Sequence, residues 1–195
     1  PHMIYLPEGD FTLEKFIADV KQAQSRYKAV IAAVSEGIKC ESVGISSELT
    51  DAFGHKYLSG IGKYLEKFTQ DNIGCKVRSI ELNVMQRCSS HIASWTDLTE
   101  AERIGRAAVI AALSEGKSGV MMAFKRISND PYRVEIVSAD IAKVANCEKK
   151  FPREWINAEG NNVTIDALNY FLPLIQGEPQ IEFRNGIPVH FRLNQ

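Results

Sequence analysis

Three charged side chains stand where they could hold a ligand that carries both hydroxyl groups and a phosphate. Glu36 follows the apolar run 30–34 and precedes Gly37. A carboxylate at the end of a buried strand can accept hydrogen bonds from two hydroxyls, and a glycine lets a ligand approach the backbone closely. Arg78 and Arg87 flank the end of a later segment, and each guanidinium is a planar fork of donors that suits phosphate.

Each of these residues also has an ordinary structural interpretation. Glu36 could cap a helix or lie on a surface loop, and solvated surface arginines are more common than phosphate-binding ones. Residues 51–55 precede an expected helix whose start could bind an anion, although a capping turn with a hydrogen-bonded His55 is favoured. His91 is expected to be structural or interfacial, and His190 to be solvated. No nucleophile stands beside an evident base, and no phosphate-binding glycine loop is present.

The composition narrows the class of protein. The chain has 195 residues, is 45% hydrophobic and 24% charged, and carries a formal net charge of -1, as ordinary globular proteins do. This balance argues against a nucleic-acid partner, and no apolar stretch approaches the ~18 residues of a membrane span. Cys40, Cys75, Cys88 and Cys147 form no closely spaced pair, so reduced thiols in a cytoplasm are expected and a zinc site is not. Residues 1–3 read as a cloning remnant.

The order of the elements predicts an α/β fold. A strand over residues 3–6, a helix from Leu13 with Asp10 as its N-cap, and a fully buried strand over 29–34 make a β-α-β unit with parallel strands. In open α/β sheets, ligands bind beyond the carboxyl ends of the strands. Glu36 is placed at such an end.

The rest of the chain carries weaker but continuous patterns. They predict a helix through 58–68, a strand over 75–82, a helix over 96–116 with Asp97 and Glu100 as a capping box, antiparallel strands over 119–124 and 132–137, a short helix over 139–145, an irregular stretch over 152–160, a helix over 164–175 and an Asn-Gly hairpin turn at 185–186.

Several short motifs follow one another in a recognisable order. They are Pro-Glu at 7–8, Ser-Glu-Gly at 35–37, the stretch 51–55, Gln-Arg at 86–87, and the stretches 144–149, 152–156 and 170–178. Together they resemble the C-terminal portion of 6-phosphofructokinases, above all of the pyrophosphate-dependent branch, from about Met3 to Glu178. The resemblance implies part of a Rossmann-like three-layer fold. Its substrate lobe would span 4–95, elements returning to the donor lobe 96–150, and a C-terminal extension 151–195.

The resemblance also implies an activity. Members of this family transfer phosphate from pyrophosphate or ATP, with Mg²⁺, to O1 of fructose 6-phosphate in glycolysis. Glu36 would then hold sugar hydroxyls, and Arg78 and Arg87 the 6-phosphate. One arginine would reach in from a neighbouring subunit, which implies a homo-oligomer. The family's glycine loop, its catalytic and metal-binding aspartates and its Met-Gly-Arg motif lie upstream of this sequence. The chain alone is therefore expected to be inactive, with no catalytic or metal-binding residue of its own.

Two departures from the family pattern keep an alternative open. Val84 stands where many relatives have His or Tyr, and Cys88-Ser89-Ser90 replaces Gly-Gly-Ser. The alternative is a non-catalytic module that binds a sugar phosphate for regulation or assembly. On either reading we expect the helix over 96–113 to expose an apolar face that packs against structure outside this sequence.

Overall fold

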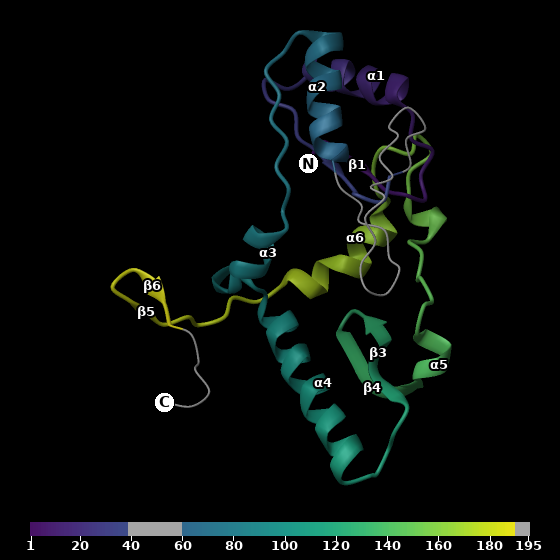
Figure 1. Cartoon of the computed structure of the whole chain (residues 1–195), viewed down its shortest axis with the longest axis vertical. Coiled ribbons are helices and arrows are strands. Elements are labelled where there is room, and N and C mark those ends of the chain that lie inside the picture. Colours follow the sequence, from purple (N-terminus) through teal and green to yellow (C-terminus); the bar gives the residue numbers. More distant parts are fainter. Residues whose placement is uncertain (39–59, 190–195) are drawn as a thin grey trace. The chain divides into compact units, whose positions relative to one another are not determined.

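The computed structural model describes residues 1–38 and 60–189. The chain divides into two compact units, described separately below (Figure 1). The first unit comprises Pro1–Leu82 with Lys150–Ala167, and the second Asn83–Lys149 with Leu168–Gln195. The chain contains both helices and strands, and it begins with a parallel strand pair joined by a helix, so the predicted α/β class is confirmed. The assignment of substrate and donor lobes to particular residues stays a prediction.

The first unit begins with the predicted β-α-β unit. Strand β1 (Met3–Tyr5) and strand β2 (Ala32–Val34) are parallel, and helix α1 (Leu13–Gln24) connects them. The N-cap of α1 is Thr12, whose hydroxyl accepts a hydrogen bond from the Lys15 N–H at 3.2 Å. The prediction of Asp10 as the cap is therefore wrong, because the helix starts two residues later than that cap requires.

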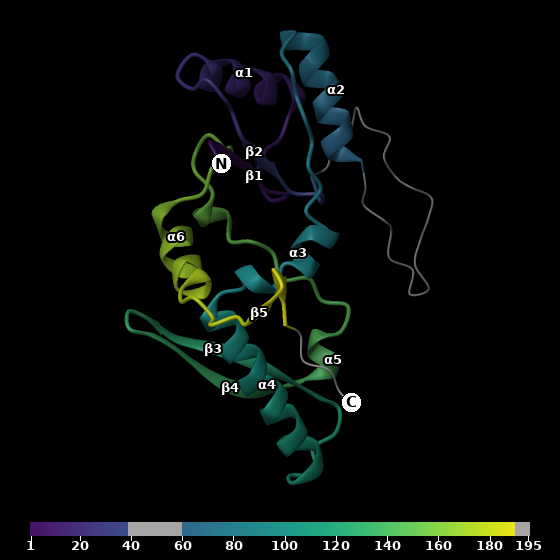
Figure 2. The same cartoon turned by 90° about the vertical axis from the view of Figure 1, so that its left-hand side faces the viewer.

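The expectation of a fully buried strand over 29–34 is also wrong. Strand β2 begins only at Ala32, and none of its three residues is buried. Helices α1 and α2 (Ile61–Ile73) lie on the same side of the strand pair (Figure 2). A parallel sheet is buried on both faces only when helices cover both, so the apolar run 30–34 keeps one face uncovered among the described residues.

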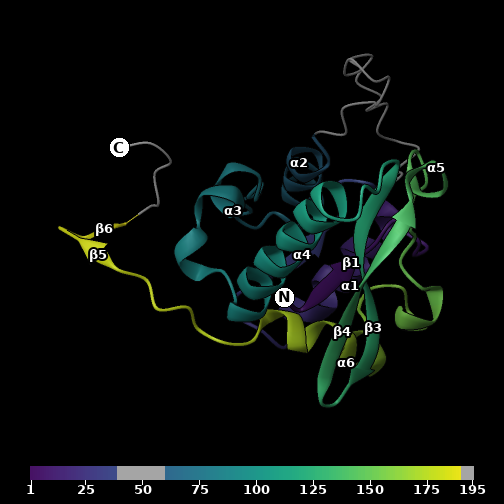
Figure 3. The ribbon, with the colours of Figure 1, turned by 90° about the horizontal axis from the view of Figure 1, so that it is seen from below.

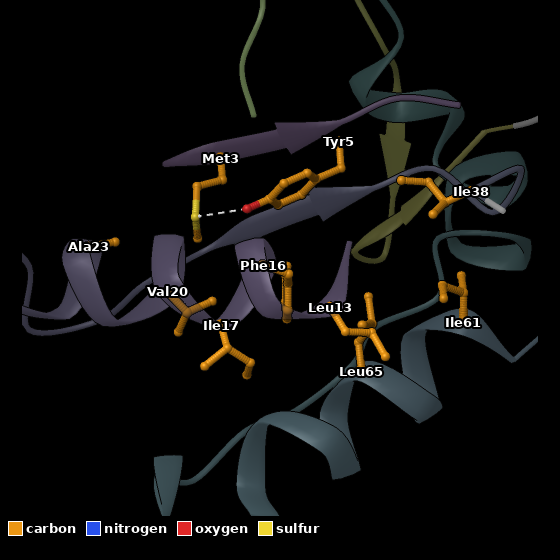
Figure 4. Close-up of a cluster of buried hydrophobic side chains, with 10 residues drawn as sticks. All are labelled: Met3, Tyr5, Leu13, Phe16, Ile17, Val20, Ala23, Ile38, Ile61 and Leu65. Atoms are coloured by element: carbon orange, nitrogen blue, oxygen red, sulfur yellow. Dashed lines mark hydrogen bonds between the residues drawn. The ribbon is translucent and has the colours of Figure 1, made fainter. Parts of the chain in front are cut away.

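The core of the first unit lies between the strands and these two helices. Met3 and Tyr5 of β1 face α1, and Leu13 of α1 lies beside Leu65 of α2 (Figure 4). The Tyr5 hydroxyl donates to Asp19 Oδ2 at 2.8 Å, which satisfies the polar end of a side chain that is otherwise buried. Burying each large apolar side chain contributes about 1.5–3 kcal/mol, so this cluster holds the site-bearing strands in place.

Residues 150–167 complete the first unit from a distant part of the sequence. The Ile4 N–H donates to the Asn161 carbonyl at 2.8 Å, and the Phe151 N–H donates to Glu8 Oε1 at 3.0 Å. The Lys15 ammonium donates to the Glu159 carbonyl. This stretch contains the short 3₁₀ helix η2 (Arg153–Trp155), in keeping with the irregular structure predicted there.

After α2 the chain reverses at Gly74, whose φ of 76° is left-handed, and returns along the helix (Figures 1 and 2). The strand predicted over 75–82 is wrong, since this return segment pairs with no strand among the described residues. Its backbone is bonded instead to side chains of α2: Gln70 Nε2 donates to the Val77 carbonyl at 3.3 Å, and the Ser79 N–H donates to Glu66 Oε2 at 2.9 Å.

The second unit is built on one long helix and one hairpin, which pack side by side (Figure 3). Its elements up to residue 149 are α3 (Val84–Cys88), η1 (Ser90–Ile92), α4 (Trp95–Leu113), β3 (Val120–Asn129), β4 (Tyr132–Asp140) and α5 (Ile141–Val144). The predicted antiparallel pair is confirmed. The predicted capping box at Asp97 and Glu100 is wrong, because Ser94 caps α4 and accepts from the Asp97 N–H at 3.1 Å.

The chain ends with α6 (Ile165–Phe171), η3 (Leu172–Ile175), β5 (Phe183–Arg184) and β6 (Ile187–Pro188). The Arg126 guanidinium of β3 lies 4.0 Å from the ring centre of Tyr170 and 4.6 Å from that of Tyr132, and it donates to the Tyr170 carbonyl at 2.7 Å. The Asn-Gly turn is confirmed, since Asn185 and Gly186 both have left-handed φ values, of 53° and 79°.

Helix α4 exposes apolar side chains, as expected from the sequence. Trp95, Leu98, Val109, Ile110 and Leu113 are all exposed, whereas Ala111 is buried. None of the helices in the described ranges combines the length and the hydropathy needed to cross a membrane.

Candidate functional site

Glu36 lies directly after β2, at the carboxyl end of the parallel pair. The Ser35 N–H donates to the Tyr5 carbonyl at 3.0 Å, and the Ile38 N–H donates back to the Ser35 carbonyl at 3.2 Å, so residues 35–38 form a tight turn. Glu36 is at the tip of this turn and exposed. Its carboxylate is therefore exposed to solvent and can accept hydrogen bonds from a ligand's hydroxyls.

Gly37 has a role in packing within the chain, besides the approach of a ligand that the sequence suggested. A Cβ at this position would lie 3.1 Å from Cγ of Pro7, tighter than most real contacts. The glycine therefore lets the turn after β2 approach the loop after β1, within the chain itself. This contact brings the two loops together at the carboxyl end of the strand pair.

A cavity of about 320 Å³ lies at the same carboxyl end. It is lined by Leu6, Pro7, Gly9, Asp10, Phe11, Thr12 and Ile38. The volume is within the range of small-molecule sites. Neither Glu36 nor Arg78 lines it. The cavity therefore shows that this end of the strand pair is accessible, and it does not by itself assign a ligand. Glu8 lies between two residues that line the cavity, and one of its carboxylate oxygens is buried with no hydrogen-bond partner among the described residues.

Arg78 lies in the return segment, between the two residues that α2 holds. It is exposed, while Val77 and Ser79 on either side are half-buried. Within the described ranges it has no ion-pair partner. Hydrogen bonds thus hold the backbone on both sides of Arg78, and its exposed guanidinium can bind an anion.

Glu66 is the residue that the sequence reasoning missed. Its Oε2 accepts from the Ser79 hydroxyl at 2.6 Å, from the Ser79 N–H at 2.9 Å and from Lys63 Nζ at 3.1 Å. The two Ser79 hydrogen bonds, followed by the one from Lys63, lower the pKa of Glu66 from 4.5 to about 2. The only signal in the sequence was its four-residue spacing from Gln70, which places both on one face of a helix.

Arg87 belongs to the second unit, whereas Glu36 and Arg78 belong to the first. It lies in the last turn of α3, exposed, and its N–H donates to the carbonyl of Asn83 at 3.3 Å. Val84 begins the same helix and is also exposed. The convergence of all three predicted residues on one ligand therefore stays a prediction.

The remaining candidates either lie outside the described residues or belong to no group of possible metal ligands among them. Residues 51–55, Cys40 and His190 lie outside the described residues. His91 is exposed in η1, and Cys75, Cys88 and Cys147 are free thiols. Residues 1–38 and 60–189 contain no group of three or more His, Cys, Asp or Glu side chains that could hold a metal ion.

The chain is similar in sequence to enzymes that act on a sugar phosphate. The chain is 36% identical over 190 residues to a pyrophosphate–fructose 6-phosphate 1-phosphotransferase of Halomonas elongata, a match that covers 96% of this chain and 45% of the relative. A protein of the same name from Xanthomonas campestris is 36% identical over 197 residues, covering 99% of this chain and 47% of the relative. No protein-family model matches the chain.

A solved structure extends the likeness to the fold. The pyrophosphate-dependent phosphofructokinase of Marinobacter aquaeolei superposes with a TM-score of 0.79 at 32% identity, over 100% of this chain and 47% of that one. The chain belongs to the pyrophosphate-dependent phosphofructokinase family. The recognition drawn from the motifs is confirmed, and so is a partial phosphofructokinase fold. The chain spans about half the length of the curated relatives it matches, which fits a C-terminal portion.

Proposed function

We propose that this chain is part of an enzyme that transfers phosphate from pyrophosphate to O1 of fructose 6-phosphate, and that it supplies part of the sugar-phosphate site. The observation that carries the proposal is the 36% identity to a pyrophosphate–fructose 6-phosphate 1-phosphotransferase over 96% of the chain. The position of exposed Glu36 at the carboxyl end of a parallel strand pair supports it, since such edges bind ligands.

The roles proposed for the three residues follow from their chemistry. Glu36 accepts hydrogen bonds from sugar hydroxyls, and Arg78 and Arg87 each donate two parallel N–H bonds to the 6-phosphate. A phosphate that stays on the product anchors the sugar, so that O1 is held in line with the group being transferred. The chain's contribution is thus orientation of the acceptor.

Donor binding and metal binding are proposed to lie outside this chain. Phosphoryl transfer depends on neutralising charge on the moving group, and Mg²⁺ would supply that in the full-length enzyme. We assign Mg²⁺ to the part of the full-length enzyme outside this chain, as the family resemblance implies. The chain alone is expected to be inactive, and the full-length enzyme to be a cytoplasmic homo-oligomer of glycolysis.

Calorimetric titration with fructose 6-phosphate tests the site. The wild-type chain is expected to bind with a dissociation constant of about 1 mM. Losing a hydrogen bond to a charged group costs about 1.5–3 kcal/mol, so Arg78→Ala and Arg87→Ala should each weaken binding at least tenfold. Arg106→Ala is the matched control, because Arg106 is an exposed arginine paired with Glu102 at 3.0 Å. Heats equal to wild type would remove the substituted arginine from the phosphate role.

The reaction itself is tested with the full-length gene product. Pyrophosphate should support phosphorylation of fructose 6-phosphate, and ATP should not. Transfer from ATP alone would overturn the proposed donor. Binding of the sugar phosphate without transfer from either donor would favour the non-catalytic module instead.

A further inference from the structure

The backbone on both sides of Arg78 is tied to one face of α2. On the N-terminal side, Gln70 Nε2 donates to the Val77 carbonyl at 3.3 Å. On the C-terminal side, Glu66 Oε2 accepts from both the N–H and the hydroxyl of Ser79, at 2.9 Å and 2.6 Å. Glu66 and Gln70 are one turn apart on the helix, so they grip the segment on either side of the arginine.

These hydrogen bonds to α2, called the tie from here on, also determine which side chains of residues 75–80 are exposed. Cys75, Val77 and Ser79 are half-buried, and Lys76, Arg78 and Ile80 are exposed. Side chains of an extended segment alternate between two faces, so holding Val77 and Ser79 against α2 directs Arg78 outward. Lys63 donates to the same Glu66 oxygen at 3.1 Å and adds a further contact to the anchoring carboxylate.

We propose that Glu66 and Gln70 are positioning residues for Arg78, holding its backbone so that the guanidinium is ordered before a phosphate binds. This inference rests on the proposed function, in which Arg78 binds the 6-phosphate. Ordering a segment before binding removes that cost from the binding step. A free return segment would have to be ordered each time the ligand binds, so loss of the tie weakens the site without removing any group that touches the ligand.

A double-mutant cycle read by NMR titration with fructose 6-phosphate tests the proposal. Glu66→Ala is expected to weaken binding by about five- to tenfold, within the range of coupling between residues of one network. In the Arg78→Ala background, Glu66→Ala should cause no further loss, because its effect passes through the arginine. Additive losses, or no loss from Glu66→Ala while Arg78→Ala weakens binding, would overturn the inference and leave the proposed function standing.

The controls separate a positioning role from a general loss of structure. Lys63→Ala removes another partner of the same carboxylate and leaves the tie to Ser79 intact, so it should bind as wild type does. Gln70→Ala loosens only the Val77 side and replaces Glu66→Ala if that variant does not fold. Glu66→Gln keeps an acceptor and should recover part of the affinity.

A ligand-independent measurement tests the tie alone. Hydrogen exchange at the Ser79 amide should be slow in wild type and in Lys63→Ala, and at least tenfold faster in Glu66→Ala. Unchanged exchange would refute the tie whatever the ligand does. Titrations in which Arg78→Ala matches wild type would remove Arg78 from the phosphate role, and titrations in which wild type does not bind would overturn the proposed sugar-phosphate site; either result would overturn this inference too.

Discussion

The two units of this chain both contain helices and strands, but they differ greatly in how many side chains they bury. In the first, ten hydrophobic side chains from β1, α1, α2 and the turn after β2 form one buried cluster. In the second, Ala111 is the only residue of the described part that is buried. Many of its large apolar side chains are exposed, among them Leu113 at 82%.

The contrast shows that secondary structure and a core are separate outcomes of one sequence. Helix α4 and the β3–β4 hairpin follow from local patterns, and both form. A core forms only where apolar faces meet, and contiguous exposed apolar surface usually marks a place where another surface packs. The second unit therefore has regular helices and strands whose large apolar side chains are mostly exposed.

Truncating one large apolar side chain in each unit should show the largest difference between the units, in the free energy of unfolding. Phe16→Ala removes a side chain that is 5% exposed, and it is expected to lower the free energy of unfolding of the first unit by about 3–5 kcal/mol. Leu113→Ala should change the stability of the second unit by no more than about 0.5 kcal/mol.

The two tryptophans allow each unit to be followed by itself in denaturant. Trp155 lies in the first unit and Trp95 in the second, so Trp95→Phe and Trp155→Phe backgrounds isolate the signals. Phe16→Leu is expected to cost less than about 1.5 kcal/mol and keeps the measurement possible if Phe16→Ala does not fold. Equal costs for Phe16→Ala and Leu113→Ala would contradict the contrast in burial.

Hydrogen exchange should show the next largest effect. Central amides of α1 are expected to exchange at least about tenfold more slowly than those of α4, since local opening is easiest where few apolar contacts are buried. Helix length alone predicts the reverse, because α4 has 19 residues and α1 has 12, and longer helices are more stable in isolation. The comparison thus decides between tertiary packing and helix length, and slower exchange in α4 would favour helix length.

The sequence predicted those parts of the fold that depend on local pattern. The β-α-β unit and the two hairpins are present because periodicity and turn residues specify them. The strand over 75–82 was wrong because alternation alone does not tell a paired strand from an extended segment. What decides is the reversal at Gly74, which brings Val77 and Ser79 to Gln70 and Glu66.

The candidate site residues were chosen from the sequence by residue type, and their roles stay a prediction; the hydrogen bonds that hold Arg78 in place could not be predicted in this way. Glu36 and Arg78 are exposed, as ligand-binding residues must be. Glu66 was missed because its role depends on a hydrogen bond across thirteen residues. Arg87 lies in the other unit, so its predicted convergence with Arg78 on one ligand stays a prediction.

The smallest predicted effect is a difference in pH response between the two units. The pKa of Glu66 is lowered to about 2 by its bonds to Ser79 and then to Lys63. A lowered pKa means that this tie stabilises the first unit above pH 4.5, and that the contribution is lost as pH falls toward 2. In the second unit, burial and then the hydrogen bond to Glu100 raise the pKa of Tyr132 from 10.0 to about 12. That contribution is present below pH 10.0 and is lost as pH rises toward 12.

Carbon-detected NMR titration of the Glu66 carboxylate measures the acidic half of this pair. Its midpoint should lie near pH 2 in wild type and move toward 4.5 in Ser79→Ala, which removes the first-named cause. Absorbance of tyrosinate in wild type and Tyr132→Phe measures the alkaline half, and the difference between them should appear near pH 12. A Glu66 midpoint that does not move in Ser79→Ala would mean that the return segment is not held by this carboxylate. The ordered Arg78 of the first unit would then have no more support than the exposed Arg87 of the second.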